Sequence, residues 1–463
     1  MVLETLNRFV WGAPALVLIL GVGVYLSVRT GFAQITLFPA ALRSFLSSLR
    51  GGEREDGVSP FQALCTALAA TVGTGNLVGV AGAMALGGPG AVFWMWICAL
   101  LGMAIKFAEA TLAVRYRICS QGEYIGGPMY MIRRGLSKRW HWLAGIYSFF
   151  GVAAAFGVGN ATQINAVITG LNEVLSSFGG RQTRCGDLAM GMVLAAMIGA
   201  MLLGGAKRIG SAAEMLVPFA ACTYVLLSAG VLIVRRDAVP GAIAAIVKGA
   251  FSPEAVTGGM LGSAFQALRI GVSRGVFTNE AGMGTASIAH ASAQVRHPVC
   301  QGLMGIMEVF LDTIVICTMT ALVILVSGVP VPYGTDAGGA LTTRAFASVY
   351  GEWVTVLLAL SLCCFAFATV LGWGLYGARC AQYLFGAGAW KWFALVQVAV
   401  VLISAVLETA AIWSLAEIMN GLMVIPNLIA LVILSPELSR LTIEYKTIYG
   451  SPAAVGGTYE NFD

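Results

Sequence analysis

Long apolar stretches recur along the whole chain, and they constrain its fold more than any other feature. Of the 463 residues, 58% are hydrophobic and only 11% are charged. A water-soluble protein of this length needs far more charge on its surface. About eleven stretches of roughly 20 residues are long enough to cross a bilayer as helices. They lie near residues 9–27, 60–86, 91–113, 142–170, 187–205, 213–234, 262–290, 301–328, 353–377, 392–410 and 412–436. The sequence therefore predicts an all-α polytopic membrane protein.

The basic residues predict how the chain is oriented in the membrane. Their densest group follows the third apolar stretch, between Arg115 and Arg139. Because cytoplasmic loops carry an excess of Lys and Arg, the distribution favours an N-terminus outside and a C-terminus inside the cell. These bases flank membrane helices, so we expect no nucleic-acid partner. The first stretch has no small-residue cleavage motif after it, and we interpret it as a retained helix.

The second apolar stretch is interrupted where a plain membrane anchor would be continuous. In the middle of residues 61–88 stand Gly73-Thr74-Gly75-Asn76, which are poor helix formers and include a carboxamide. In hydrocarbon, backbone that leaves the helix must be satisfied by protein groups, water, ions or a ligand. The interruption therefore predicts a cavity at membrane depth. The alternative is that the glycines only let two helices pack closely.

A second interruption lies in residues 271–291. Its centre is polar and glycine-rich, with Thr278, Asn279, Glu280, Gly282 and Gly284. It lies five stretches after the first interruption, so the two broken helices run in opposite directions. Inverted repeats with paired broken helices are typical of the midplane binding site of secondary transporters. Together the two breaks favour a binding site over simple helix packing.

This pairing predicts a division of the chain into two five-helix repeats. The expected segments are an extra helix and cytoplasmic loop at 1–59, a first repeat at 60–235, an external loop at 236–261, an inverted second repeat at 262–437, and a cytoplasmic tail at 438–463.

The first break also predicts which charges a bound solute carries. N–H groups at the start of a half-helix carry partial positive charge, and carbonyls at the end of one carry partial negative charge. A carboxylate could bind the amides of Thr74, Gly75 and Asn76. A small cation could bind carbonyls just before the break, around Ala69, Thr71 and Val72. A zwitterion, or an anion with a co-transported cation, would suit such a site.

Two further stretches carry polar side chains one helical turn apart. Asn160 and Gln163 share one helix face, as do Thr369 and Trp373. The carboxamides could bind a substrate, or they could hydrogen-bond between helices. The hydroxyl of Thr369 with the carbonyl of Ala366 would suit sodium. The indole of Trp373 could cap the substrate, or it could belong to the interfacial aromatic belt.

Ionisable side chains at membrane depth must be paired or hydrated. Those at apparent membrane depth are Lys106, Glu109, Glu280, Glu308 and Asp312. For Lys106 and Glu109, three residues apart, we expect a structural ion pair. For Glu280 we expect hydrogen bonds to the backbone of the break or to Arg274, with a gating or proton role as the alternative.

The sequence does not indicate an enzyme or a resident cofactor. Its ten cysteines form no Cys-x-x-Cys pair, and its three histidines have no partner at metal-ligand spacing. No Ser/His/Asp set is visible. The glycines at 73, 75 and 79 miss the spacing of a dinucleotide fingerprint and lack its βαβ context. We expect no enzymatic activity and no cofactor beyond a coupling ion.

Several long motifs are familiar from one transporter family. They lie at residues 60–117, 122–130 (GEYIGGPMY), 204–219 (GGAKRIGSAAEMLVPF), 275–291 (GVFTNEAGMGTASIAHA) and 365–386 (FAFATVLGWGLYGARCAQYLFG). They resemble the alanine or glycine:cation symporter family, the bacterial and archaeal sodium:alanine symporters. The resemblance extends from about Trp11 to beyond Phe385.

The resemblance implies a fold and a set of binding residues. The implied fold is the five-plus-five inverted repeat of the leucine transporter, preceded by one extra helix. The implied substrate contacts are Gly75, Asn76, Gln163, Phe277, Thr278, Met283, Thr369 and Trp373. The implied sodium ligands are the carbonyls of Ala69, Val72 and Ala366 and the hydroxyl of Thr369.

The expected function is sodium-coupled uptake of alanine, glycine or both by alternating access. We expect a monomer in the lipid of a prokaryotic inner membrane. A pocket walled by Phe277, Met283 and Trp373 should fit a methyl side chain better than a leucyl one. The nearer alternative is a proton-coupled carrier with Glu280 or Glu109 as relay. An ion channel or a receptor using the same cavity is the more distant one.

Overall fold

The described part of the chain is almost entirely helical. The computed structural model describes residues 12–49, 57–120, 122–177, 179–252, 263–335, 338–406 and 410–449. Most of the predicted tail, from residue 450 onward, and residues 253–262 around the end of the predicted external loop lie outside this range.

Among the described residues, three helices precede the first predicted repeat, and that repeat begins with a broken helix. The three are α2 (Ala13–Arg29), α3 (Ala33–Thr36) and α4 (Phe38–Leu49). The helices up to Val234 are α5 (Pro60–Thr71), η1 (Gly75–Gly79), α6 (Val80–Gly87), α7 (Gly90–Arg115), α8 (Pro128–Gly135), η2 (Lys138–Trp140), α9 (Trp142–Phe156), η3 (Gly157–Ala161), α10 (Thr162–Ser177), α11 (Arg184–Leu203) and α12 (Gly205–Val234).

The second half of the chain also begins its long helices with a broken one. Between the halves lie η4 (Arg236–Ala238) and α13 (Val239–Phe251). The second half contains α15 (Ala264–Asn279), α16 (Thr285–His290), α17 (Pro298–Val309), η5 (Phe310–Cys317), α18 (Thr318–Val326), α19 (Gly338–Tyr350), α20 (Val354–Phe385), α21 (Ala389–Ser404) and α22 (Ala410–Tyr449).

One small sheet interrupts the helical architecture. Strands β1 (Ile118–Ser120) and β2 (Glu123–Ile125) form an antiparallel hairpin in which Ile118 lies opposite Ile125. Glu123 on this hairpin pairs with Arg379 near the end of α20, at 2.6 Å. The hairpin, which the sequence did not predict, thus joins the segment after α7 to α20.

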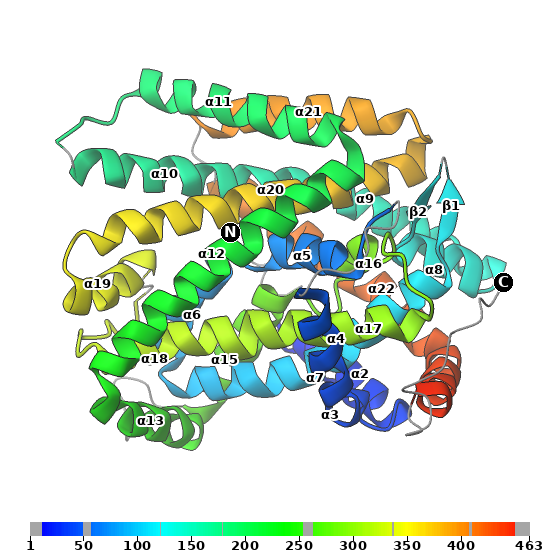
Figure 1. Ribbon diagram of the computed structural model, residues 1–463, viewed down its shortest axis with the longest axis horizontal. Coiled ribbons are helices and arrows are strands. Elements are labelled where there is room, and N and C mark those ends of the chain that lie inside the picture. Colours follow the sequence, from blue (N-terminus) through cyan, green and yellow to red (C-terminus); the bar gives the residue numbers. More distant parts are fainter. Residues whose placement is uncertain are drawn as a thin grey trace.

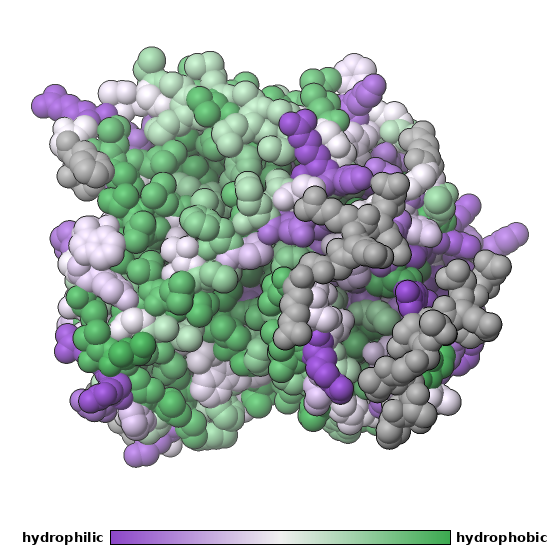
Figure 2. Space-filling view, in the orientation of Figure 1, coloured by the Kyte–Doolittle hydropathy of each residue, from purple (hydrophilic) through white to green (hydrophobic). Residues whose placement is uncertain are grey.

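The apolar helices make this a multi-pass membrane protein. Among the described residues, seven helical segments are long and apolar enough to cross a membrane, or eight with the bent pair Pro60–Thr71 and Gly75–Gly87. Two shorter apolar helices are Pro14–Arg29 and Ala389–Ser404. Figure 2 shows apolar side chains over most of one face, with hydrophilic ones gathered toward two opposite ends. The count of eleven spans, the orientation and the division into repeats stay predictions.

The first break is where the sequence predicts it. Helix α5 starts at a capping box in which Ser59 and Gln62 satisfy each other's backbone amides, with Pro60 at its first position. It ends at Thr71, because Val72 is extended, with ψ 113°. The chain turns helical again as a π-helix at Gly75, and the two parts are bent by 53°.

The second break is confirmed as well. Helix α15 ends at Asn279, and Glu280, Gly282 and Gly284 take left-handed conformations with φ of 54°, 94° and 77°. Such angles are easy for glycine and uncommon for a residue with a side chain. The helix restarts as α16, which packs against α5. In Figure 1, α5 and α16 lie near the centre, between α10 and α20 on one side and α7 and α15 on the other.

Candidate functional site

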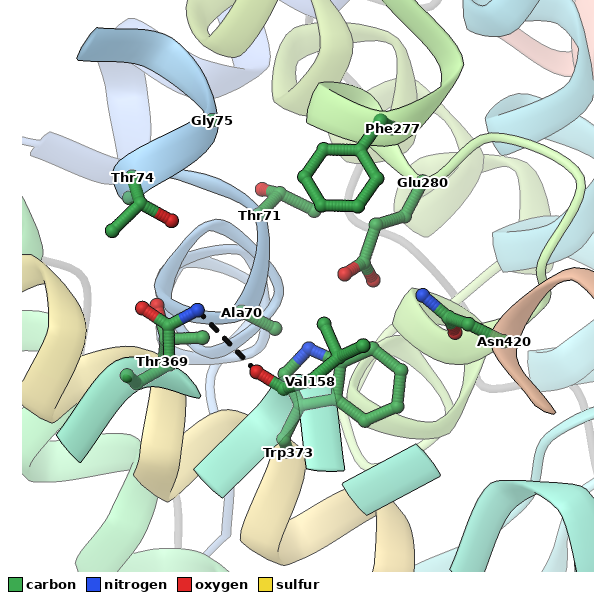
Figure 3. Close-up of a pocket in the computed structure, with 12 residues that line it drawn as sticks. Ala70, Thr71, Thr74, Gly75, Val158, Phe277, Glu280, Thr369, Trp373 and Asn420 are labelled. Carbon is green, nitrogen blue, oxygen red and sulfur yellow. Dashed lines mark hydrogen bonds between the residues drawn. The ribbon is translucent and has the colours of Figure 1, made fainter. Parts of the chain in front are cut away.

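A small cavity lies where the two broken helices meet α10, α20 and α22. Five of the eight predicted substrate contacts line it: Gly75, Gln163, Phe277, Thr369 and Trp373. The other lining residues are Ala70, Thr71, Gly73, Thr74, Val158, Glu280 and Asn420 (Figure 3). Its volume is about 30 Å³, room for about two water molecules. A larger ligand therefore requires the lining side chains to move apart.

Asn76 is fully buried and does not line this cavity. Its side-chain oxygen accepts a hydrogen bond from the amide of Gly73 at 2.9 Å. Its side-chain nitrogen donates to the carboxylate and to the carbonyl of Asp312, at 2.8 and 3.0 Å. Its amide donates to the carbonyl of Gly73 at 3.2 Å. Asn76 thus holds the unwound segment together and fastens it to η5.

Thr278 and Met283 also lie outside the cavity lining. Thr278 is buried and donates its hydroxyl to the carbonyl of Arg274 at 2.8 Å. It stands directly behind Gly75, where a Cβ would lie 3.4 Å from the Thr278 hydroxyl. Met283 is fully buried in the apolar core. Thr278 thus supports the wall of the site at Gly75 from behind.

Two of the four predicted sodium ligands, Ala69 and Thr369, meet where α5 packs against α20. The hydroxyl of Thr369 lies 2.8 Å from the carbonyl oxygen of Ala69. Val72 is the first residue beyond α5, and Ala366 is buried one turn before Thr369. Oxygen atoms such as these are the ligands that hard cations prefer.

Gln163 reaches the cavity from the first turn of α10. Its side-chain nitrogen donates to the carbonyl of Val158 at 3.3 Å, the dashed line in Figure 3. Its side-chain oxygen is buried and has no hydrogen-bond partner among the described residues, and the same holds for the side-chain oxygen of Asn420 on α22. Buried polar atoms normally have partners. Two residues that line the cavity thus each have a buried acceptor without a partner in the described part of the chain.

A π-helix, η3, comes directly before Gln163 on this side of the site. The glycine-containing segment Gly157–Ala161 is wound more widely than an α-helix, a form often found at functional sites. A Cβ on Gly159 would overlap the side chain of Trp373. The close approach of η3 to α20 thus needs a glycine here. Sequence reasoning missed η3 and Asn420; the Gly157-x-Gly159-Asn160 motif was the available signal for η3.

Glu280 occupies the second break itself. Its left-handed backbone points the side chain into the cavity, toward Trp373 and Asn420 (Figure 3). The hydroxyl of Thr285 donates to its carboxylate at 2.7 Å. The partner of the Glu280 side chain is therefore Thr285, whereas the sequence suggested the backbone of the break or Arg274 as partners.

The predicted ion pair between Lys106 and Glu109 is wrong. Lys106 pairs instead with Glu308 on α17, at 2.7 Å, and His290 lies 2.9 Å from the other oxygen of Glu308. Glu109 lies one turn further along α7. There one of its oxygens accepts hydrogen bonds from the amides of Gly282 and Gly284, at 3.0 and 3.1 Å. Spacing on one helix suggested a local pair, but neighbouring helices provide the partners.

Asn427 completes the contacts of Glu109. Its side-chain nitrogen donates to the same carboxylate oxygen at 2.7 Å and to the carbonyl of Gly282 at 2.9 Å. A carboxylate at the free amides of a helix start is favoured by their partial positive charge. Glu109 on α7 and Asn427 on α22 thus hold the second break in place.

The similarity of this sequence to known proteins extends over nearly the whole chain. The sequence model of the sodium:alanine symporter family matches residues 1–451. The sodium/alanine symporter AgcS of Methanococcus maripaludis is 43% identical over 438 residues, 93% of this chain and 94% of that protein. An uncharacterised transporter of Haemophilus influenzae is 43% identical over 450 residues, 96% of this chain and 95% of its own.

A solved transporter structure resembles the fold. The crystal structure of MhsT in complex with L-phenylalanine superposes with a TM-score of 0.54, covering 87% of this chain and 91% of MhsT. The sequence identity is 16%, so the likeness concerns the fold alone. That fold is the one shared by leucine-transporter-like proteins.

Proposed function

Because this chain belongs to the sodium:alanine symporter family, whose members are transporters and not enzymes, we propose that it carries alanine, glycine or both into the cell together with sodium. The observation that supports this most is the meeting of two broken helices at one buried cavity. Broken helices expose backbone groups that can bind both ends of a zwitterion and a cation.

In this proposal the substrate carboxylate binds at the first break. Thr74 and Gly75 line the cavity at the start of η1, where amides carry partial positive charge. The amide of Asn76 already donates to Gly73, so its part is to hold the break in shape. Phe277 and Trp373 provide apolar walls, which suits a small side chain.

Sodium binds, in this proposal, to the carbonyls of Ala69, Val72 and Ala366 and to the hydroxyl of Thr369. The site would join the end of α5 to α20, and sodium there would order the first break. An ordered break presents its amides to the substrate, so each ligand would raise the affinity for the other by the same factor. Rocking of the broken helices against their neighbours would then move both ligands across the inner membrane of a prokaryotic cell, in a monomer.

Ligand binding to purified protein tests the substrate class. Alanine and glycine should bind in sodium buffer with an affinity at least about tenfold above that of leucine, because several additional methyl and methylene groups must fit a small pocket. Replacing sodium by choline should weaken alanine binding. Equal affinities for alanine and leucine, or an alanine affinity that is the same with and without sodium, would contradict the proposal.

Proton coupling is the second candidate, and the carboxylate of Glu280 in the cavity wall favours it. A carboxylate at the substrate could load and release a proton during each cycle. Alanine flux at fixed pH, with and without sodium, separates the two couplings. Flux that persists without sodium and follows a proton gradient would support this second candidate.

A further inference from the structure

We propose that Glu280 binds the ammonium group of the transported amino acid and thereby makes an α-ammonium group a requirement for binding. This inference rests on the proposed function, because it concerns the same cavity and the same substrate class. It adds a residue to the site and states which part of the substrate that residue recognises.

The second break aims the Glu280 carboxylate at the cavity. Glu280 ends α15 in a left-handed conformation, with φ 54°, and only 5% of its surface is exposed. A non-glycine residue rarely adopts this conformation, and the strain is typical of functional positions. The hydroxyl of Thr285 holds the carboxylate at 2.7 Å, which leaves the rest of the group facing the cavity.

The charge of Glu280 has no cationic partner within 4 Å among the residues that the structure describes. Lys106, the buried cation on neighbouring α7, is engaged by Glu308. A buried carboxylate is costly unless a cation or several hydrogen bonds compensate it. An ammonium group entering the cavity would provide that compensation.

Asn420 lies on the same side of the cavity as Glu280. Its buried side-chain oxygen has no partner among the described residues, and in Figure 3 its side-chain nitrogen is the atom turned toward Glu280. In Figure 3, Glu280 and Asn420 lie on one side of the cavity and Thr74 and Thr369 on the other. An ammonium group has only donors, so the carboxylate of Glu280 is a suitable acceptor on this side. The indole of Trp373 lies between the two sides and could contribute a cation–π contact.

This arrangement gives the cavity an electrostatic direction. One end carries the carboxylate of Glu280, and the other end carries the helix-start amides at Thr74 and Gly75. A zwitterionic α-amino acid matches both ends at once. A hydroxy acid or a simple carboxylic acid matches only one and leaves Glu280 buried and unpaired. The cavity should therefore reject lactate and propionate, although they resemble alanine in size.

The central experiment compares the wild type with Glu280→Gln. Glutamine keeps the shape and can still accept the hydrogen bond from Thr285, so only the charge is lost. Alanine binding should weaken at least about tenfold, the effect of losing a charged hydrogen bond. Sodium binding without amino acid, measured as sodium-dependent thermal stabilisation, should stay as in the wild type. Unchanged alanine affinity, or a parallel loss of alanine and sodium binding, would overturn the inference.

Two further variants keep the test decisive if Glu280→Gln does not fold. Glu280→Asp keeps the charge but retracts it by one methylene, and Thr285→Val frees the carboxylate from its hydroxyl donor. Each should weaken alanine binding severalfold and leave sodium-dependent stabilisation intact. Alanine affinity at the wild-type level in both variants would contradict the role of Glu280.

The result also separates this inference from the proposed function. If the wild type binds neither alanine nor glycine, the proposed function fails. If the wild type binds alanine and Glu280→Gln binds it equally well, the proposed function stands and only the inference about Glu280 fails. Lactate tested on the wild type adds an independent reading, since binding as tight as that of alanine would show that no ammonium is required.

Discussion

The hydroxyl of Thr369 on α20 lies 2.8 Å from the carbonyl oxygen of Ala69 near the end of α5, although 300 residues separate the two in the chain. The hydroxyl also lies 3.0 Å from the carbonyl of Phe365. The contact fastens the last turn before the first break to a long, continuous helix. A cation bound at the same oxygen atoms would strengthen that link.

Thr369→Val therefore tests the sodium site. Valine keeps the shape but removes the oxygen ligand, so the sodium concentration needed for half-maximal alanine uptake should rise at least about tenfold. Thr369→Ser keeps the hydroxyl and is the matched control, with a sodium requirement close to that of the wild type. A sodium titration of alanine uptake in both variants gives the answer, and an unchanged requirement in Thr369→Val would remove Thr369 from the site.

Asn76 is predicted to act through the shape of the break. Asn76→Ala removes the donors to Asp312 and the acceptor for the amide of Gly73, leaving a buried carboxylate and a backbone amide with fewer partners. We expect a loss of stability of about 1–3 kcal/mol, measured by thermal unfolding in detergent. Asp312→Asn can still accept from Asn76 and should be milder. Equal stability of Asn76→Ala and the wild type would contradict this role.

The buried pair of Lys106 and Glu308 is predicted to be structural. Lys106→Met leaves the Glu308 carboxylate buried, with only His290 beside it. Breaking a buried pair in this way costs about 3–5 kcal/mol, which should appear as a large fall in the unfolding temperature. The double variant Lys106→Met with Glu308→Met removes both charges and should recover much of that loss. A double variant no more stable than the single one would argue against the pairing.

Gly159 is predicted to set the position of Trp373. Gly159→Ala places a methyl group where the Trp373 side chain lies, so the indole must move and alanine binding should weaken several-fold. Gly145→Ala is the matched control, because a Cβ at Gly145 meets nothing within 4 Å. Isothermal titration with alanine compares the two. Equal affinities in the two variants would show that η3 does not position the site.

The sequence was sufficient for the features that depend on local composition. Gly73 and Gly75, and likewise Gly282 and Gly284, weaken a helix wherever it packs, so both breaks could be predicted and are confirmed. Apolar length likewise predicted a multi-pass membrane protein.

What depends on the packing of distant segments could not be predicted in this way. The sequence places Lys106 and Glu109 on one helix turn, but the actual partners of these residues lie on α17, in the second break and on α22. Asn76 was predicted to contact the substrate because it stands in the break. In the structure its side-chain nitrogen donates a hydrogen bond to Asp312, 236 residues away.

Asn420 was not predicted as a site residue for the same reason. It is one of two asparagines in an apolar stretch, and only the packing of α22 brings it to the cavity.

Alanine uptake into proteoliposomes under an imposed sodium gradient tests the central claim most directly. Vesicles containing the purified protein should accumulate radiolabelled alanine when sodium is high outside. They should fail to do so when choline replaces sodium at the same pH and membrane potential. Accumulation that is equal in sodium and in choline, or absent in both, would contradict sodium-coupled alanine transport by this protein.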